Sequence, residues 1–190
     1  MKKFFSITIV ALFLSLSSSF TATGNGFQKD NLYIGPTVGY NYYFASGTLG
    51  FGARGEYGLM DKVDVGTFKG SIGLGAELFY SSYKYEWGGY WDKWSYTSFL
   101  IFAAFHFQPK EAFDPYVRAG LGFANVSYTS SWTGTYGGSG YNYGSGLDYT
   151  ASIGFNYRFS NSMSFRADLG YPVLLSAGID FNLGKMAWQK

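Results

Sequence analysis

The ionisable residues best suited to chemistry lie inside segments in which polar and apolar residues alternate. All four arginines occupy such positions, and four carboxylates share their face of the alternation. The eight residues are Arg54, Glu56, Glu77, Arg118, Arg158, Arg166, Asp168 and Asp180. A planar guanidinium pairs with a carboxylate through two parallel hydrogen bonds, which favours arginine over lysine where water is excluded. The pattern predicts an internal, charge-balanced ion-pair network, with chance placement as the alternative.

The single histidine and one glycine-rich segment are the other candidates for chemistry. His106 has no evident serine and carboxylate partners for nucleophilic catalysis, so we expect a structural histidine. The segment Gly50–Gly55 (GFGARG) formally matches a dinucleotide-binding fingerprint, but that motif must join a strand to a helix, and here the alternation continues. No His, Cys and carboxylate spacing is typical of a metal site. The sequence therefore predicts no catalytic residue, cofactor or metal.

The composition describes a chain that has too few charges to cover a soluble surface. Of 190 residues only 14% are charged, 22% are aromatic, 27 are glycine and none is cysteine. Soluble domains carry about 25% charged residues. The aromatic content excludes disorder, the missing cysteines exclude a disulfide scaffold, and the length suits one domain.

The N-terminus has the pattern of an export signal. A basic start (Met1–Lys3) precedes an apolar run (Phe4–Leu16) that is too short for a membrane-spanning helix, and small residues follow. This order predicts a signal peptide over residues 1–23, cleaved near 22–24, and one domain over 24–190; a buried amphipathic helix is the alternative. Removing the two lysines near the start leaves 12 basic residues against 12 acidic ones. Nothing therefore favours nucleic-acid binding.

Alternation of apolar and polar residues recurs in eight later segments. Each is about as long as a tilted strand that crosses a bilayer, roughly 9 to 11 residues or more. The segments are Asn31–Phe44, Leu49–Leu59, Phe68–Lys84, Ser95–Phe107, Tyr116–Tyr128, Leu147–Phe159, Met163–Tyr171 and Leu175–Leu183. The sequence therefore predicts eight antiparallel strands.

The polar face of these segments indicates which side is inside. It is rich in Gly and Ser with isolated charges, as suits a narrow interior, whereas a water-facing strand would carry Lys, Glu and Thr. The apolar face ends in aromatic residues, which gather at bilayer interfaces. We therefore predict an all-β, eight-stranded antiparallel up-and-down transmembrane β-barrel, in preference to a soluble lipocalin-like barrel or a β-sandwich. Side chains would fill its lumen.

The connections predict an orientation and a contact surface. The two longest, residues 85–94 and 129–146, are the third and fifth, so they share one side; long loops lie outside the cell, which places both termini in the periplasm. Tyr and Trp interleaved with Gly and Ser in these loops are typical of adaptable binding surfaces, although a packed cap above an aromatic girdle is the alternative. The candidate contact residues are Trp87, Tyr90, Trp91, Trp94, Trp132, Tyr136, Tyr141 and Tyr143.

Three segments carry a resemblance to a known family. Phe113–Phe123 (FDPYVRAGLGF), Ser71–Tyr80 (SIGLGAELFY) and Ser176–Leu183 (SAGIDFNL) make the chain similar to the small OmpA-like and OmpX-like outer-membrane barrels. The resemblance covers the whole of the expected mature chain, and it implies a fold and not an activity. Two departures are that Met186–Lys190 lacks the family's terminal aromatic residue and that no peptidoglycan-binding domain follows the barrel.

These observations predict a non-enzymatic protein of a Gram-negative outer membrane, with a structural role or a role in surface or partner contacts. One alternative is a narrow conduit for a small solute, such as a hydrophobic one, and another is a lipid-modifying barrel enzyme. The expected partners are outer-membrane lipid and either another envelope protein or a surface ligand, with no nucleic acid.

Overall fold

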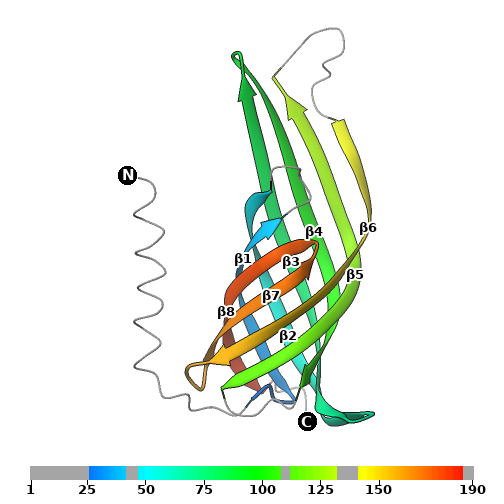
Figure 1. The fold of residues 1–190 in the computed structure, drawn as a ribbon, viewed down its shortest axis with the longest axis vertical. Coiled ribbons are helices and arrows are strands. Elements are labelled where there is room, and N and C mark those ends of the chain that lie inside the picture. Colours follow the sequence, from blue (N-terminus) through cyan, green and yellow to red (C-terminus); the bar gives the residue numbers. More distant parts are fainter. Residues whose placement is uncertain (1–25, 42–46, 108–111, 132–140, 186–190) are drawn as a thin grey trace.

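Eight strands form one closed ring. The structure, a computed structural model, describes residues 26–41, 47–107, 112–131 and 141–185, so the predicted signal peptide, Trp132 and Tyr136 lie outside the described residues. The strands are β1 (Asn31–Asn41), β2 (Thr48–Val65), β3 (Phe68–Trp87), β4 (Tyr90–Phe107), β5 (Phe113–Ser130), β6 (Tyr141–Arg158), β7 (Met163–Tyr171) and β8 (Val173–Lys185). Each pairs antiparallel with the next, and β8 closes on β1 (Figure 1). The predicted eight-stranded up-and-down barrel is confirmed.

The ring closes with a stagger. Partner residues followed from Thr37 through β2, β3, β4 and β5 lead to Gly146 on β6. Followed the other way, through β8 and β7, they lead to Asn156, ten residues further along the same strand. Such a stagger tilts the strands and fixes the width of the barrel. The result is a tube narrow enough for side chains to fill.

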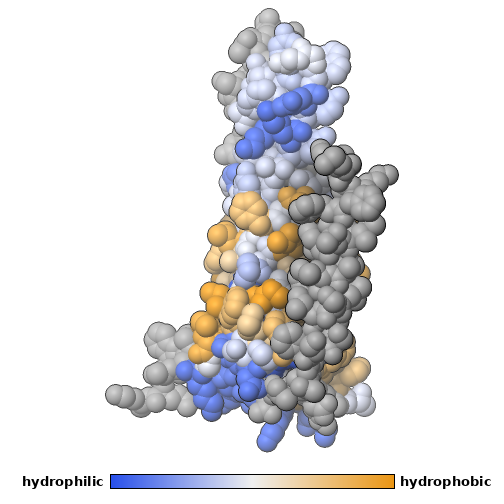
Figure 2. Space-filling view, turned by 90° about the vertical axis from the view of Figure 1, so that its left-hand side faces the viewer, coloured by the Kyte–Doolittle hydropathy of each residue, from blue (hydrophilic) through white to orange (hydrophobic). Residues whose placement is uncertain are grey.

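The alternation along the strands sorts residues by face as predicted. Leu121 on β5 is 69% exposed and Phe51 on β2 is 65% exposed, whereas Arg118 and Arg54 on the same strands are buried. On β4 the inward residues Leu100 and Phe102 are apolar as well. Figure 2 shows an apolar band around the middle of the visible face, with hydrophilic zones above and below it. No helix in the described part of the chain is long and apolar enough to span a membrane.

The third connection differs from the prediction. Residues 85–94 are not a loop: β3 continues to Trp87, β4 begins at Tyr90, and only Gly88 and Gly89 form the turn. Both glycines have positive φ, 57° and 84°, the backbone that a two-residue hairpin requires and that side chains disfavour. The aromatic residues around the turn are therefore cross-strand neighbours. They continue the alternation of the strands, which stops only at the two glycines.

Four strands are much longer on one side of the molecule. β3, β4, β5 and β6 rise above the level at which β1, β2, β7 and β8 meet their turns (Figure 1). On β6 the pairing with β7 begins only at Ala151, so the upper half of β6 pairs with β5 alone. We call the upper parts of these four strands the extension. It is a curved sheet, and no described strand lies opposite it.

Candidate functional site

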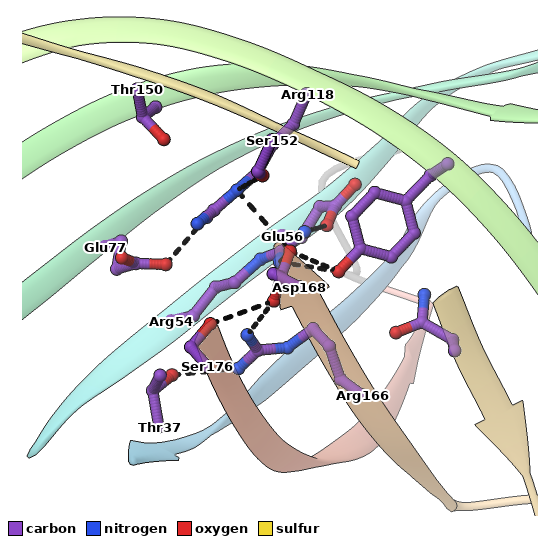
Figure 3. A network of polar contacts seen from close by, with 12 residues as sticks. Thr37, Arg54, Glu56, Glu77, Arg118, Thr150, Ser152, Arg166, Asp168 and Ser176 are labelled. Atoms are coloured by element: carbon purple, nitrogen blue, oxygen red, sulfur yellow. Dashed lines mark hydrogen bonds and ion pairs between the residues drawn. The ribbon is translucent and has the colours of Figure 1, made fainter. Parts of the chain in front are cut away.

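Asp168 on β7 is the centre of the lumen. Its Oδ1 lies 3.2 Å from Arg54 Nη1 and 3.6 Å from Arg118 Nε, and its Oδ2 lies 3.0 Å from Arg166 Nη1 (Figure 3). The Tyr116 hydroxyl also donates to Oδ1, at 2.5 Å. All of these side chains are buried. One carboxylate is thus shared by guanidinium groups from three strands, β2, β5 and β7.

Each of these arginines also binds a second carboxylate. The pairs are Arg54 with Glu56, Arg118 with Glu77 at 2.6 Å, and Arg166 with Asp180 at 3.0 Å. The Phe102 ring lies beneath two of the guanidinium groups, those of Arg54 and Arg118, at 4.6 and 5.1 Å. Buried charges are tolerated only where partners compensate them. The structure therefore joins seven of the eight candidate residues into one network across the lumen.

Arg158 stands apart from this network. It is buried near the turn between β6 and β7, and within the described residues it forms no ion pair. Its guanidinium instead lies 5.7 Å from the centre of the Tyr33 ring. On β6, Asn156 is the partner of Arg166, whereas Arg158 is the partner of Ser164. Its position nearer the end of the barrel explains why it does not reach the central carboxylate.

His106 has partners that the sequence did not suggest. Its Nε2 lies 2.8 Å from Glu56 Oε1 and its Nδ1 lies 2.9 Å from Asp114 Oδ2, so a carboxylate faces each ring nitrogen. The sequence alone indicated neither of these carboxylates as a partner of His106. Asp114 lies on the same face of β5 as Tyr116 and Arg118, so extending the alternation by one inward position would have found it. No hydroxyl nucleophile bonds the ring within the described residues.

The segment before β1 covers the lower end of the lumen. The buried Phe27 ring stacks on the His106 ring at 3.8 Å and on the Tyr33 ring at 4.9 Å. The backbone N–H of Gln28 donates to the Tyr33 hydroxyl at 3.0 Å, and that of Asp30 donates to the Gly58 carbonyl at 2.7 Å. The segment is therefore held both by ring stacking and by hydrogen bonds to the barrel.

A buried apolar cluster closes the upper end of the lumen. Phe79 and Tyr96 meet Val126 and Val173 there. The Tyr96 hydroxyl donates to Asp148 Oδ2 at 2.6 Å. Val173 is the first residue of β8, whereas the other three lie on β3, β4 and β5, which continue above this level. The cluster therefore marks the level at which the tube opens into the extension.

The polarity of the strands reverses above this cluster. The outward face of the extension carries Ser82, Lys84, Glu86, Lys93, Ser95, Asn125, Ser127 and Thr129. Its inward face, continuing from Phe79, Tyr96 and Val126, carries Tyr83, Tyr85, Trp87, Tyr90, Asp92, Trp94, Tyr128 and Ser130. In the barrel the apolar face points out and the polar face in. In the extension the order is the opposite, as in a sheet surrounded by water.

The candidate contact residues occupy different places in this sheet. Trp87 and Tyr90 form the tip of the inward face and are 74% and 51% exposed. Trp94 is deeper on the same face and its ring lies 4.6 Å from the Tyr128 ring. Trp91 is on the outward face, where Lys84 Nζ lies 5.2 Å from its ring centre. The backbones of Tyr141 and Tyr143 belong to β6, not to a loop.

One carboxylate, Asp92, is held among the aromatic residues of the inward face. The Tyr128 hydroxyl donates to its Oδ1 at 2.8 Å. Hydrogen bonds from the Ser130 and Tyr128 hydroxyls lower the pKa of Asp92 below its ordinary value, so the group is an anion at neutral pH. The inward face thus combines flat aromatic rings with one fixed negative charge.

Known structures share this fold, although no protein-family model and no curated protein matches the chain. The N-terminal β-barrel domain of OprF from Pseudomonas aeruginosa superposes with a TM-score of 0.50 and 20% identity, over 82% of this chain and 98% of that chain. Ail, the attachment invasion locus protein of Yersinia pestis, in complex with the heparin analogue sucrose octasulfate, superposes with a TM-score of 0.50 and 16% identity. That match covers 80% of this chain and 97% of Ail. The fold is therefore that of a transmembrane β-barrel.

Proposed function

We propose that the protein is a non-enzymatic β-barrel of the bacterial outer membrane that makes contacts at the cell surface through its extension. Both termini are on the periplasmic side in this proposal. The observation that carries it is the change of polarity along β3, β4 and β5: the same strands are suited to lipid below and to water above. In outer-membrane barrels the long connections are extracellular and the short turns periplasmic. The extension is the long side.

The filled lumen argues against a conduit. Three layers of buried side chains block it: the Phe27 and His106 stack, the network around Asp168, and the cluster around Phe79. Moving a solute through the middle layer would require breaking buried ion pairs, which leaves uncompensated charges and costs several kcal/mol, about 3 to 5 for each pair broken. We therefore infer that the barrel supports the extension and does not transport.

The histidine site argues against a lipid-modifying enzyme. Nucleophilic catalysis requires a hydroxyl within hydrogen-bond reach of the base, together with access for substrate. His106 instead lies between two carboxylates and is fully buried beneath the Phe27 ring. These contacts support a structural role for it.

Single cysteines would test the topology, because the chain has none of its own. Glu86→Cys lies at the exposed tip of the extension, and Thr67→Cys lies in the exposed turn between β2 and β3 at the opposite end. An impermeant maleimide added to intact cells is expected to label Glu86→Cys, and to label Thr67→Cys only after the outer membrane is permeabilised. The reverse pattern would overturn the proposed orientation.

Conductance would test the closed lumen. The purified protein in planar bilayers is expected to give no sustained single-channel current, and liposomes that contain it should not swell in sugar solutions. Sustained conductance by the folded, heat-modifiable form would favour the conduit instead. These two experiments address the barrel and the extension separately.

A further inference from the structure

We propose that the inward face of the extension binds a neutral oligosaccharide, stacking pyranose rings on its tyrosine and tryptophan side chains. This inference rests on the proposed function, since it requires the extension to stand in water at the cell surface. It concerns the upper part of this face, where Tyr85, Trp87 and Tyr90 are exposed above the level at which the described strands of the opposite wall end.

Among the described residues, no strand lies opposite the upper part of this face. Its lower part, Tyr83 and Trp94, packs on the buried cluster around Phe79 and Val173. Above that level the short wall has ended, and the exposed fraction rises to 53% for Tyr85 and to the high values of the tip. Large aromatic side chains are rarely left exposed side by side on a protein surface. Exposed patches of this kind mark binding sites.

The aromatic residues of this face all carry a polar group. Every ring on this face is Tyr or Trp, so each carries a hydrogen-bonding group at its edge, and above Val126 the described residues of the face include no aliphatic side chain. The lipid-facing surface of the barrel, by contrast, mixes Leu, Ile, Val and Phe. An acyl chain or the apolar core of a protein partner would be matched by aliphatic side chains. A pyranose has C–H groups on its faces and hydroxyls around its rim, which suits flat rings with polar edges.

The two faces of the extension differ in charge. The one ionised group among the described residues of this face is the Asp92 carboxylate. The two lysines of the extension, Lys84 and Lys93, are direct cross-strand partners on the opposite face. A sulfated or phosphorylated saccharide would therefore meet an anion here and no cation, whereas the hydroxyls of a neutral saccharide can donate to Asp92. The chemistry selects an uncharged ligand.

The neighbouring strand β6 has only glycines at the described inward positions beside this face. On β6 the inward positions beside this face are Gly144 and Gly146, the partners of Val126 and Ala124. A Cβ placed at either glycine would meet no atom within 4 Å, so Gly146 can take a larger side chain beside the aromatic rings without a clash.

The test compares two tryptophans of one hairpin. The refolded protein in detergent micelles is titrated with maltohexaose, cellohexaose and chitohexaose as neutral probes, and with a heparin hexasaccharide as the anionic probe, while tryptophan fluorescence and calorimetric heat are followed. At least one neutral probe is expected to bind, with an affinity that added sodium chloride does not change. Trp87→Ala is expected to weaken that binding about tenfold, as removal of an important aromatic contact commonly does.

The matched control is Trp91→Ala, which removes the same side chain from the outward face and should leave the affinity unchanged. Gly146→Gln is a second variant: it puts a polar side chain on β6 beside the aromatic face without a clash and should weaken binding while the unfolding midpoint stays the same. Binding of none of the neutral probes, binding of the heparin fragment alone, or equal losses in Trp87→Ala and Trp91→Ala would each overturn the proposal. None of these outcomes affects the cysteine-labelling test, so failure of the ligand and failure of the orientation are distinguishable.

Discussion

The barrel and the extension share strands, but their apolar residues lie on opposite faces of the sheet. We call the part of the barrel with the apolar outer band the belt. On β5, Leu121 faces outward in the belt, and eight residues later Thr129 faces outward in the extension. Arg118 faces inward in the belt, and Tyr128 faces inward in the extension. The backbone pairing with β4 continues unbroken through this change. Strand geometry is thus set by the ladder, while the choice of which face is apolar is set by what surrounds each level.

The largest expected effect is in the lumen. Arg54→Ala leaves Glu56 and Asp168 without one of their cations, and removal of one partner of a buried pair costs about 3 to 5 kcal/mol. We expect a lower unfolding midpoint in urea and loss of heat-modifiable gel mobility at moderate temperature. Arg118→Ala should behave similarly through Glu77. Unchanged midpoints in both variants would contradict a buried network.

The next effect separates the two levels of β5. Leu121→Arg puts a charge on the lipid-facing side of the belt, which costs about 2 to 4 kcal/mol near the bilayer midplane. Thr129→Arg makes the same kind of change on the same face of the extension, where water surrounds it, and should cost less than about 0.5 kcal/mol. Unfolding of both variants in lipid vesicles measures the difference. Equal costs would mean that the extension also lies in lipid.

A smaller effect is expected at the turn of the extension. Gly88 has a φ of 57°, and an L side chain in that region costs about 1 to 2 kcal/mol. Gly88→Ala should therefore speed hydrogen exchange near the tip of the hairpin, at Glu86 and Trp91, and leave the barrel amides unchanged. Accelerated exchange in the belt would show that the extension and the barrel unfold together.

The smallest effect is the counterpart of the first. Glu86 Oε1 lies 2.6 Å from Lys84 Nζ, but both side chains are largely exposed, and such pairs contribute about 0 to 1 kcal/mol. Glu86→Ala should leave the unfolding midpoint almost unchanged. A loss comparable to that of Arg54→Ala would remove the distinction between buried and exposed ion pairs.

The sequence predicted the barrel better than it predicted the extension. In the belt, alternation has one meaning, because lipid outside and packing inside select opposite residue types, so the strands and the inward arginines follow from the period of two. In the extension the alternation continues with aromatic residues on one face and hydroxyl or charged residues on the other, and neither face resembles the belt. The sequence of residues 85–94 therefore resembles that of a loop, although Trp87 pairs with Tyr90 across the hairpin.

The contacts across the lumen were beyond sequence reasoning for a different reason. The face of a residue follows from its parity, but its height depends on the stagger of the whole ring. That stagger brings Asp168 to Arg54 and Arg118 and leaves Arg158 near the end of the barrel. His106 and Glu56 meet for the same reason, although fifty residues separate them in the chain.

The ten-residue stagger also makes the seam between β1 and β8 a checkpoint for assembly. Every earlier hairpin can form locally, but the seam joins the first strand to the last, so it can close only when all seven other pairings have the right offset. A slip of one residue anywhere would turn the arginines of a strand toward acyl chains, and an unclosed edge would leave bare amides in hydrocarbon. Insertion of this protein is therefore expected to finish in a single concerted step, in which membrane and ring closure reject misaligned intermediates together.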